Sequence, residues 1–292
     1  MAQPLYSIGI DLGTTNCAVA YAPLDDARAT SLTLPLLQWE TPTAMAEFSA
    51  LPSFLWLPTD AERDQLRGKS AAGGAEEWVV GRLARHQAAL TPERVVHSAK
   101  SWLGHHAVDR AAAFLPWGTD AVAAAKKISP IRAAALLLNY IQSAWDQKFA
   151  SEGSGALFAS QEITITVPAS FDAAAQRLTL EAARSAGFPD RVRLLEEPQA
   201  AFYRWLEQHE ADGATAAAPP TSTALSNTAA EAGAAPSAVA DAAHAPATPG
   251  ALQKLLPELK DRRQLILVVD IGGGTSDFSL FDIAQEVASA AP

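Results

Sequence analysis

Two short segments, far apart in the chain, place an aspartate, glycines and threonines directly after an apolar run. Residues 8–16 read Ile-Gly-Ile-Asp-Leu-Gly-Thr-Thr-Asn, and residues 268–277 read Val-Val-Asp-Ile-Gly-Gly-Gly-Thr-Ser-Asp. Glycine lets the backbone turn sharply and approach a ligand, and successive backbone N–H groups in such a turn form an anion-binding nest. Threonine hydroxyls add donors, and a carboxylate holds Mg²⁺ directly or through water. The two segments therefore predict a site for the polyphosphate and the metal of a nucleotide.

Other motifs with binding chemistry fit the chain less well. Gly68-Lys69-Ser70 ends like a Walker A loop, but Arg63 stands where the first glycine of that loop is required. The glycines at 272 and 274 lack the third glycine of a dinucleotide-binding fingerprint. His105-His106 has no accompanying cysteine or carboxylate cluster, which favours an exposed loop over a metal site. One Asp-x-Gly-Thr turn alone would be read as an ordinary β-turn, but two after apolar strands indicate paired phosphate-binding hairpins.

The patterns around these turns predict strands that alternate with helices. Proline after an N-cap residue marks helix starts at Thr91-Pro92 and Ser129-Pro130. Asp172 is suited to cap another helix, and Gly187 to close it in the left-handed conformation. The expected strands cover 5–22 (two strands), 51–57, 78–80, 163–167, 192–195 and 265–270, with a hairpin to about 283. The expected helices cover 130–149, 172–186 and a segment from Pro198, with a short helix, weakened by Pro257, over 252–259.

Strands alternating with helices indicate an α/β domain built on a mixed sheet. Residues 211–250 contain Ala, Pro, Thr, Ser and Gly with almost no large apolar side chains, and such a segment cannot bury enough surface to offset its chain entropy. We therefore expect a first domain over 1–209, a disordered low-complexity insert over 210–250, and the helix and first hairpin of a second domain over 251–292. The apolar run 265–270 predicts a strand covered on both faces. Because a lone hairpin is marginally stable, this second domain is expected to be incomplete.

Charge and composition restrict the partners. The 292-residue chain carries a formal net charge of −10 and has an isoelectric point near 5.1, which argues against binding a nucleic-acid backbone. Its one cysteine, Cys17, excludes an intramolecular disulfide, fits a reducing compartment and is expected to be a small buried side chain. Neither a secretory signal nor an uninterrupted run of 18 apolar residues is visible. We expect no membrane partner and a cytoplasmic location.

Together with the two glycine–threonine segments, the segments at 165–171 and 196–201 resemble those of the heat-shock 70 (DnaK-type) chaperone family. Their order and spacing are specific, and the resemblance covers nearly the whole chain except about 208–262. The matching segments are residues 10–16 and 270–275 (two phosphate motifs), 165–171 with 175–177 (first connecting motif), 196–201 (Glu-Glu-Pro-Gln-Ala-Ala, against Asn-Glu-Pro-Thr-Ala-Ala) and, more weakly, 95–104 (the segment with a catalytic lysine).

The resemblance implies an actin-like ATPase fold, in which two lobes on ribonuclease-H-like sheets bind ATP and Mg²⁺ between them. Lobe I would be complete here, and lobe II truncated after its first β-hairpin. Asp11 and Asp270 would face Mg²⁺, mostly through water, with Glu197 further out. Lys100 would place the attacking water, and Thr275 would lie nearest the γ-phosphate. The other phosphate-binding residues implied are Gly13, Thr14, Thr15, Asn16, Gly272, Gly273 and Gly274, and the implied interlobe relay is Pro168 and Arg177.

Each of these roles has a simpler alternative that the sequence leaves open. Asp11 and Asp270 could be aspartates that merely form turns, and Lys100 could be a solvated surface lysine. Glu197 could simply precede a helix and interact with its dipole. Arg177 could be an exposed helix residue that pairs with the glutamate four positions later.

The function implied by the resemblance is that of an ATP-binding and ATP-hydrolysing molecular chaperone. Its partners in the full-length family are unfolded client polypeptides and co-chaperones. The family's adenosine motif and substrate-binding domain have no counterpart in this sequence, so we expect the chain alone to bind ATP weakly and to be weakly active or inactive. The alternatives are another actin-like protein, such as a sugar kinase or filament protein, and an inactive fragment serving only as an interaction module. Residues 165–171 and 196–201 favour the chaperone.

Overall fold

The computed structural model describes residues 3–26, 29–66, 77–212, 264–272 and 276–283. The chain divides into two compact units. The first contains Met1–Ala200 and Val269–Ser279, and the second contains Ala201–Val268 and Leu280–Pro292. Nearly all of the expected low-complexity insert, and the expected helix at 252–259, lie outside the described residues.

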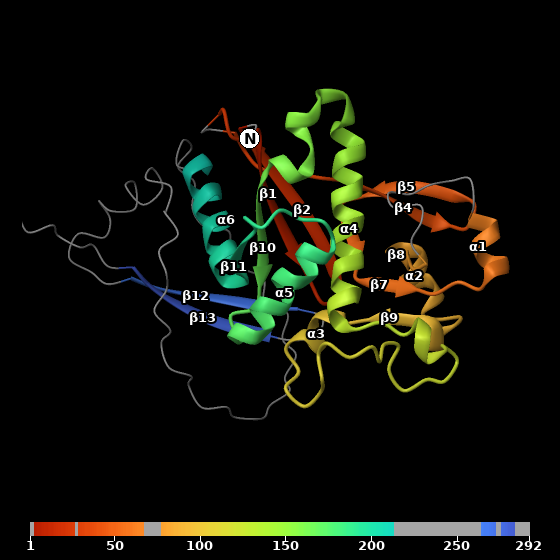
Figure 1. Cartoon of the computed structure of the whole chain (residues 1–292). Coiled ribbons are helices and arrows are strands. Elements are labelled where there is room, and N and C mark those ends of the chain that lie inside the picture. The colour runs from red at the N-terminus through yellow and green to blue at the C-terminus, as the bar shows by residue number, and fades with distance from the viewer. Residues whose placement is uncertain (1–2, 27–28, 67–76, 213–263, 273–275, 284–292) are drawn as a thin grey trace, which may run out of the picture. The chain divides into compact units, whose positions relative to one another are not determined.

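A mixed sheet forms the centre of the first unit (Figure 1). Its order is β11-β10-β1-β2-β3, and β6 also pairs with β2. β1 pairs in parallel with β10, and β10 in parallel with β11, whereas β2 runs antiparallel to β1, β3 and β6. The six strands are β1 (Tyr6–Leu12), β2 (Asn16–Pro23), β3 (Leu32–Thr33), β6 (Ala50–Pro52), β10 (Glu162–Val167) and β11 (Arg193–Glu196).

Alternation of side chains along β1 fixes the register of this sheet. Ile8 and Ile10 are fully buried, and they lie opposite Ile163 and Ile165 of β10, which are also buried. Because a shift of one residue would turn the apolar set to the opposite face, this pairing is strongly specified. The same register places Asp11, at the end of β1, opposite a residue of β10.

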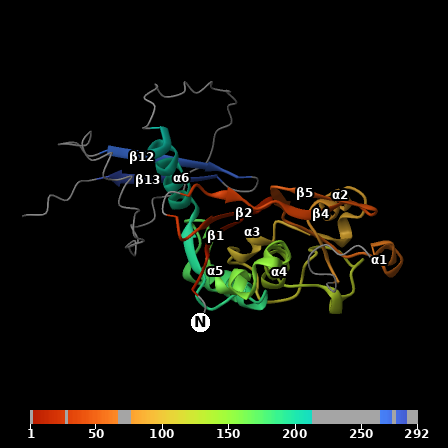
Figure 2. The same cartoon turned by 90° about the horizontal axis from the view of Figure 1, so that it is seen from above.

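The two longest helices of the first unit begin and end as their capping residues predict. α4 (Pro130–Phe149) follows Ser129, whose side chain accepts a hydrogen bond from the Arg132 N–H. α5 (Ala173–Ser185) follows Asp172, whose carboxylate accepts from the Ala175 N–H, and the chain leaves it through Gly187 at φ 91°. The two helices pack against each other and cover one face of the central sheet (Figure 2).

Short elements extend the first unit beyond the central sheet, and most of them were not predicted. The expected strand at 51–57 is divided at Ser53 into β6 and β7, and the helix expected at Thr91-Pro92 is a single 3-10 turn. β7 (Phe54–Trp56) is the second part of that expected strand, and β8 (Val79–Val80) matches the strand expected at 78–80. The elements that were not predicted are β4 (Leu36–Thr41), β5 (Ala44–Phe48), β9 (Val95–His97), α1 (Asp60–Leu66), α2 (Arg82–Gln87) and α3 (Ala99–Leu103). The 3-10 turns are Pro92–Arg94, Ala124–Lys126, Ala150–Glu152, Ser154–Ala156 and Phe158–Ser160.

Aromatic side chains supply much of the core of the first unit. Tyr6, Tyr21, Trp145 and Phe149 form a cluster with ring centroids 4.2 to 5.8 Å apart, which joins α4 to β1 and β2. The predicted core positions Trp56, Trp78 and Trp145 are buried, and Trp205 is half-buried. None of the helices in the described ranges is long and apolar enough to span a bilayer.

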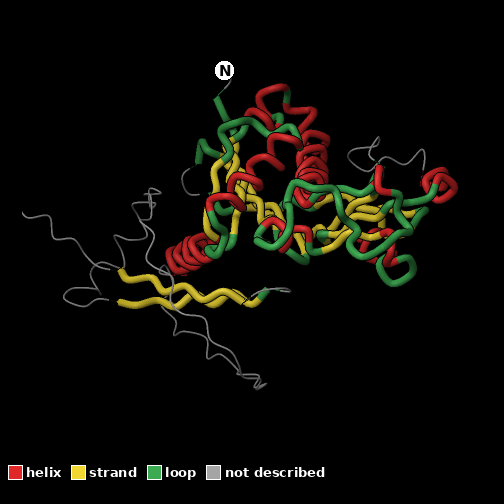
Figure 3. The backbone as a smooth tube through the Cα atoms, turned by 60° about the horizontal axis from the view of Figure 1, so that its bottom comes forward, coloured by secondary structure: helices red, strands yellow, loops and turns green. Residues whose placement is uncertain are grey.

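The second unit contains most of α6 (Glu197–Asp212) together with parts of a two-stranded ribbon. The ribbon is formed by β12 (Gln264–Ile271) and β13 (Ser276–Ile283), as expected for the hairpin (Figure 3). Within this unit the ring of Phe202 stacks on that of Phe281, with centroids 5.0 Å apart.

One prediction about the β12–β13 ribbon is wrong. The apolar run of β12 was expected to be covered on both faces, but every second residue is exposed. The exposed apolar face consists of Leu265, Leu267, Val269, Ile271, Phe278 and Leu280, which are between 44 and 78% exposed. In a two-stranded ribbon the alternate side chains point to opposite faces, and no described residue covers this one.

Candidate functional site

The first glycine–threonine turn connects β1 to β2 very tightly. A Cβ atom added to Gly13 would lie only 2.1 Å from the backbone oxygen of Asn16, a separation that no side chain tolerates. Thr15 and Asn16 are exposed and Thr14 is half-buried. The turn thus needs glycine at 13 and leaves three potential donors accessible, as phosphate binding requires.

Ser53 contacts the inner side of this turn. Its hydroxyl donates a hydrogen bond of 2.7 Å to the Gly13 carbonyl, and its backbone N–H donates one of 2.9 Å to the Thr15 carbonyl. The sequence pattern does not single out Ser53, because it lies within an apolar segment that has the pattern of one continuous strand. A single small polar residue between Pro52 and Phe54 was the available signal.

Asp11 occupies the end of β1, immediately before the turn, and its side chain is exposed. The Thr166 hydroxyl of β10 donates to its carboxylate at 3.1 Å, because the parallel register places the two residues side by side. Thr166 therefore orients the carboxylate while one face of Asp11 stays open to a ligand. An exposed carboxylate with polar oxygen neighbours suits Mg²⁺, which keeps several waters and binds few protein ligands.

Lys100 and Glu197 come together from two separate motifs. The Lys100 ammonium of α3 donates to a carboxylate oxygen of Glu197, the first residue of α6, and their side chains are only 8 and 16% exposed. Burial raises the pKa of Glu197, the positive charge of Lys100 opposes that rise, and the charges of Asp11 and Asp270 add to it. The alternative that Lys100 is a solvated surface residue is therefore wrong. Glu197 does begin a helix, but it also forms a largely buried ion pair.

Cys17, at the start of β2, behaves as the predicted small buried residue. It is fully buried, its Sγ lies 3.3 Å from the Ser53 hydroxyl oxygen, and burial raises its pKa to about 11. A thiol with so high a pKa is a poor nucleophile at neutral pH. The cysteine therefore packs beneath the turn.

The second glycine–threonine segment is only partly described. Asp270 is half-buried next to the last residue of β12, and Gly272 is exposed directly after the strand. Gly273, Gly274 and Thr275, which carry the rest of this motif, lie outside the described residues. Their predicted contacts with phosphate stay predictions.

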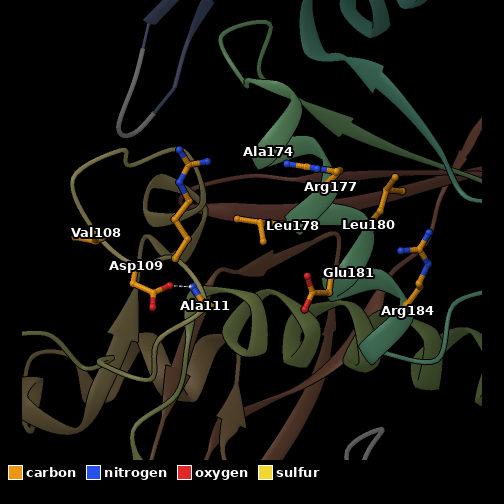
Figure 4. A pocket seen from close by; sticks show the side chains of 10 residues that line it. Val108, Asp109, Ala111, Ala174, Arg177, Leu178, Leu180, Glu181 and Arg184 are labelled. Atoms are coloured by element: carbon orange, nitrogen blue, oxygen red, sulfur yellow. Dashed lines mark hydrogen bonds between the residues drawn. The ribbon is translucent and has the colours of Figure 1, made fainter.

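The two residues predicted to form a relay lie on and before α5. Pro168 is buried directly after β10, and Arg177 is exposed on α5. Arg177 lines a cavity of about 670 Å³ between α5 and the loop at 108–111 (Figure 4). The charged side chains around this cavity are Asp109, Arg110, Arg177, Glu181 and Arg184.

The histidine pair next to this loop is exposed, as predicted. His106 lies 3.6 Å from the Asp172 carboxylate, and Arg110 makes hydrogen bonds to both side chains. The Ala175 N–H, followed by the Arg110 guanidinium, lowers the pKa of Asp172. In the described part of the chain, no group of three or more His, Cys, Asp or Glu side chains could hold a metal by itself.

The fold and this turn define an α/β domain with a mixed sheet and an accessible glycine–threonine loop at the end of its central strand. Residues 71–205 match the family described as Hsp70 protein. The chain is 30% identical to the chaperone protein HscA homolog of Pseudoalteromonas atlantica over 209 residues, which are 68% of this chain and 28% of that protein.

Other relatives give the same result. HscA homologs of Haemophilus influenzae and Bordetella pertussis are 32 and 30% identical over 68 and 72% of this chain, and over 28 and 30% of their own lengths. These matches confirm the resemblance drawn from the motifs: the chain is related to the N-terminal part of Hsp70-family proteins. It spans less than a third of the length of these relatives.

Proposed function

We propose that the chain is part of an ATP-binding and ATP-hydrolysing chaperone of the Hsp70 type. The observation that carries this proposal is the ion pair between Lys100 and Glu197, which lie 97 positions apart. A buried charge without a partner is costly, so Lys100 and Glu197 each need the other. The contact joins residues 95–104 and 196–201, two of the segments that resemble the Hsp70 family, although neither segment alone indicates the pairing. Perturbed ionisable groups of this kind gather at functional sites.

The order of the central sheet supports an actin-like assignment. β2 runs opposite to its neighbours while β1, β10 and β11 run parallel, with α4 and α5 packed over them. We assign this arrangement to a ribonuclease-H-like lobe I over 1–209. We assign 210–250 to an insert and 251–292 to the start of lobe II.

The proposed chemistry is phosphoryl transfer from ATP to water. Backbone and hydroxyl donors of residues 13–16 and 272–275 would hold the phosphates, and Asp11 and Asp270 would hold Mg²⁺ mainly through water. Lys100, fixed by Glu197, would orient the attacking water and offset negative charge on the transferred group. When bound, Mg²⁺ would neutralise charge on the phosphate oxygens. The effect of both Asp11 and Asp270 on the pKa of Glu197 supports their assignment to one site.

The partners of this function would be unfolded polypeptides and co-chaperones, as the HscA relatives are named chaperone proteins. Pro168 and Arg177 would transmit the nucleotide state to the rest of the protein. We propose a cytoplasmic location, in keeping with the acidic composition and the single buried cysteine.

Steady-state hydrolysis by the full-length protein tests the proposal. Lys100→Ala and Thr275→Ala should lower kcat on the order of a hundredfold while changing the Kd for Mg-ATP much less, because they act on the transferring group. Lys148→Ala, which alters an exposed lysine of α4, is the matched control and should change neither. Unchanged turnover in the first two variants would remove their assigned roles.

Calorimetry on the chain itself gives a second test. The assigned motifs would contact only the phosphates and the metal, so we expect weak binding of Mg-ATP. Micromolar affinity would contradict this expectation and would imply that another copy or a partner contributes to the site.

A further inference from the structure

We infer that Ser53 is a positioning residue, which aims the backbone donors of the first glycine–threonine turn at the phosphate. This inference rests on the proposed function and adds a residue that lies outside every motif on which that function is based. Ser53 is 3% exposed, so its hydroxyl is directed at protein atoms.

The geometry of the peptide bond links Ser53 to the ligand side of the turn. In a planar trans peptide the C=O and the following N–H point in opposite directions. The carbonyls of Gly13 and Thr15 both accept hydrogen bonds from Ser53. The N–H groups of Thr14 and Asn16 therefore point away from Ser53, and Ser53 fixes the direction of two donors at once.

The strands on either side of Ser53 explain why it lies at this place. β6 pairs with β2 so that Pro52 lies opposite Asn16, which brings the next residue under the turn. β7, which follows Ser53, pairs with β9, and β9 ends three residues before Lys100. Ser53 thus lies between the element that carries the turn and the element that leads to Lys100.

The choice of serine also follows from its surroundings. The Gly13 carbonyl accepts its hydrogen bond from the Ser53 hydroxyl, and the buried Cys17 thiol lies 3.3 Å from the same hydroxyl oxygen. Alanine would fill most of the volume but leave the carbonyl without this donor, and threonine would keep the hydroxyl. The inference is therefore specific to the hydroxyl group.

Amide hydrogen exchange on the unchanged chain and three variants tests the contact itself. Ser53→Ala keeps the residue-53 N–H but removes the hydroxyl bond, so exchange at residue 53 should become about tenfold faster. Ser53→Thr should restore most of the protection. Ser129→Ala, the same change at the N-cap of α4, is the control, and it should leave residue 53 as protected as in the unchanged chain. Equal protection at residue 53 in Ser53→Ala and Ser129→Ala would overturn the inference.

Binding of Mg²⁺ with tripolyphosphate, and of Mg-ATP, tests the consequence for the ligand. Ser53→Ala should raise both dissociation constants about tenfold, while Ser53→Thr and Ser129→Ala should stay within about threefold. If the unchanged chain binds and Ser53→Ala binds equally well, the positioning role is refuted while the proposed function stands. If the unchanged chain binds neither probe at millimolar concentration, the phosphate site proposed for this chain fails, and the phosphate-directed role of Ser53 fails with it.

Discussion

The two glycine–threonine segments share a sequence pattern but differ in what surrounds them. The first follows β1, which lies between β10 and β2 in the middle of a sheet, and Ser53 and Cys17 pack beneath its turn. The second belongs to a two-stranded ribbon, of which one face carries large apolar side chains that are mostly more than half exposed. The comparison shows that the same sequence pattern can join two paired strands within a larger sheet and within a ribbon of two strands.

Of the substitutions proposed, a change at Gly13 should disturb the first glycine–threonine turn most severely. In Gly13→Ala the new Cβ would lie 2.1 Å from a backbone oxygen, so we expect the turn to rearrange and the free energy of unfolding to fall by about 3 kcal/mol or more. Gly9→Ala on the same strand is the control, because its Cβ would meet its nearest neighbour at 4.0 Å. Chemical denaturation measures both variants, and equal stability would show that the turn is not constrained as described.

Truncation of one apolar side chain in each region tests the difference in burial. Ile10→Ala removes a fully buried side chain from β1 and should cost about 2–4 kcal/mol. Leu267→Ala removes a side chain that is 58% exposed on β12 and should cost less than about 0.5 kcal/mol. Denaturation of the chain measures both. A large cost for Leu267→Ala would show that this face is covered in solution, which would weaken the comparison.

The ion pair between Glu62 and Arg94 lies within the first unit and should make the stability of the chain depend on pH. Arg94 makes bonds of 2.6 and 3.0 Å to the two carboxylate oxygens and another to the Leu57 carbonyl, just beyond β7. The hydrogen bonds from Arg94 lower the pKa of Glu62 from 4.5 to about 2. Because the folded pKa is lower than the unfolded one, the contribution is complete above about pH 5 and is lost as the pH falls from about 4.5 to about 2.

Glu62→Gln should therefore destabilise the chain by about 1–2 kcal/mol at pH 7, since the carboxylate is partly exposed. The difference from the unchanged protein should shrink steadily below pH 4.5. Denaturation curves at several pH values measure this, with Glu93→Gln next to Arg94 as the control. A difference that stays constant down to pH 2 would contradict the lowered pKa.

The reactivity of Cys17 is a sensitive measure of opening beneath the first turn, and the effect expected there is the smallest of those predicted. With a pKa of about 11, roughly one thiol in a thousand is ionised at pH 8, and the side chain is fully buried. Native protein should therefore react with a maleimide far more slowly than unfolded protein. Gly13→Ala should accelerate the reaction and Leu267→Ala should not. Fast reaction of the native chain would show that the turn opens readily.

The sequence was sufficient where local chemistry decides the structure. Ser129-Pro130, Asp172 and Gly187 act through caps and backbone preferences within their own helices, so the bounds of α4 and α5 were predictable. The apolar strands around the first turn were predictable for a similar reason.

Contacts between distant segments were harder to predict. The pairing of Lys100 with Glu197 was foreseeable only through a family resemblance, because nothing near either residue indicates the other. Ser53 interrupts an apolar run whose periodicity continues across it. The division into β6 and β7 therefore depends on the hydrogen bonds between Ser53 and the first glycine–threonine turn. The exposed apolar face of β12 was not predictable, because hydrophobicity alone does not tell whether another element covers a strand.

The position of β1 in the sheet has a consequence for how the protein is made. Its Ser7 lies opposite Glu162, so one edge of this early strand stays without its native neighbour until about 155 further residues have been synthesised. At typical translation rates of about 5 to 20 residues per second, that interval lasts roughly 8 to 30 seconds. During it the β1–β2 hairpin presents an open edge that other chains can join, which makes the nascent polypeptide itself a candidate for assistance by chaperones on the ribosome.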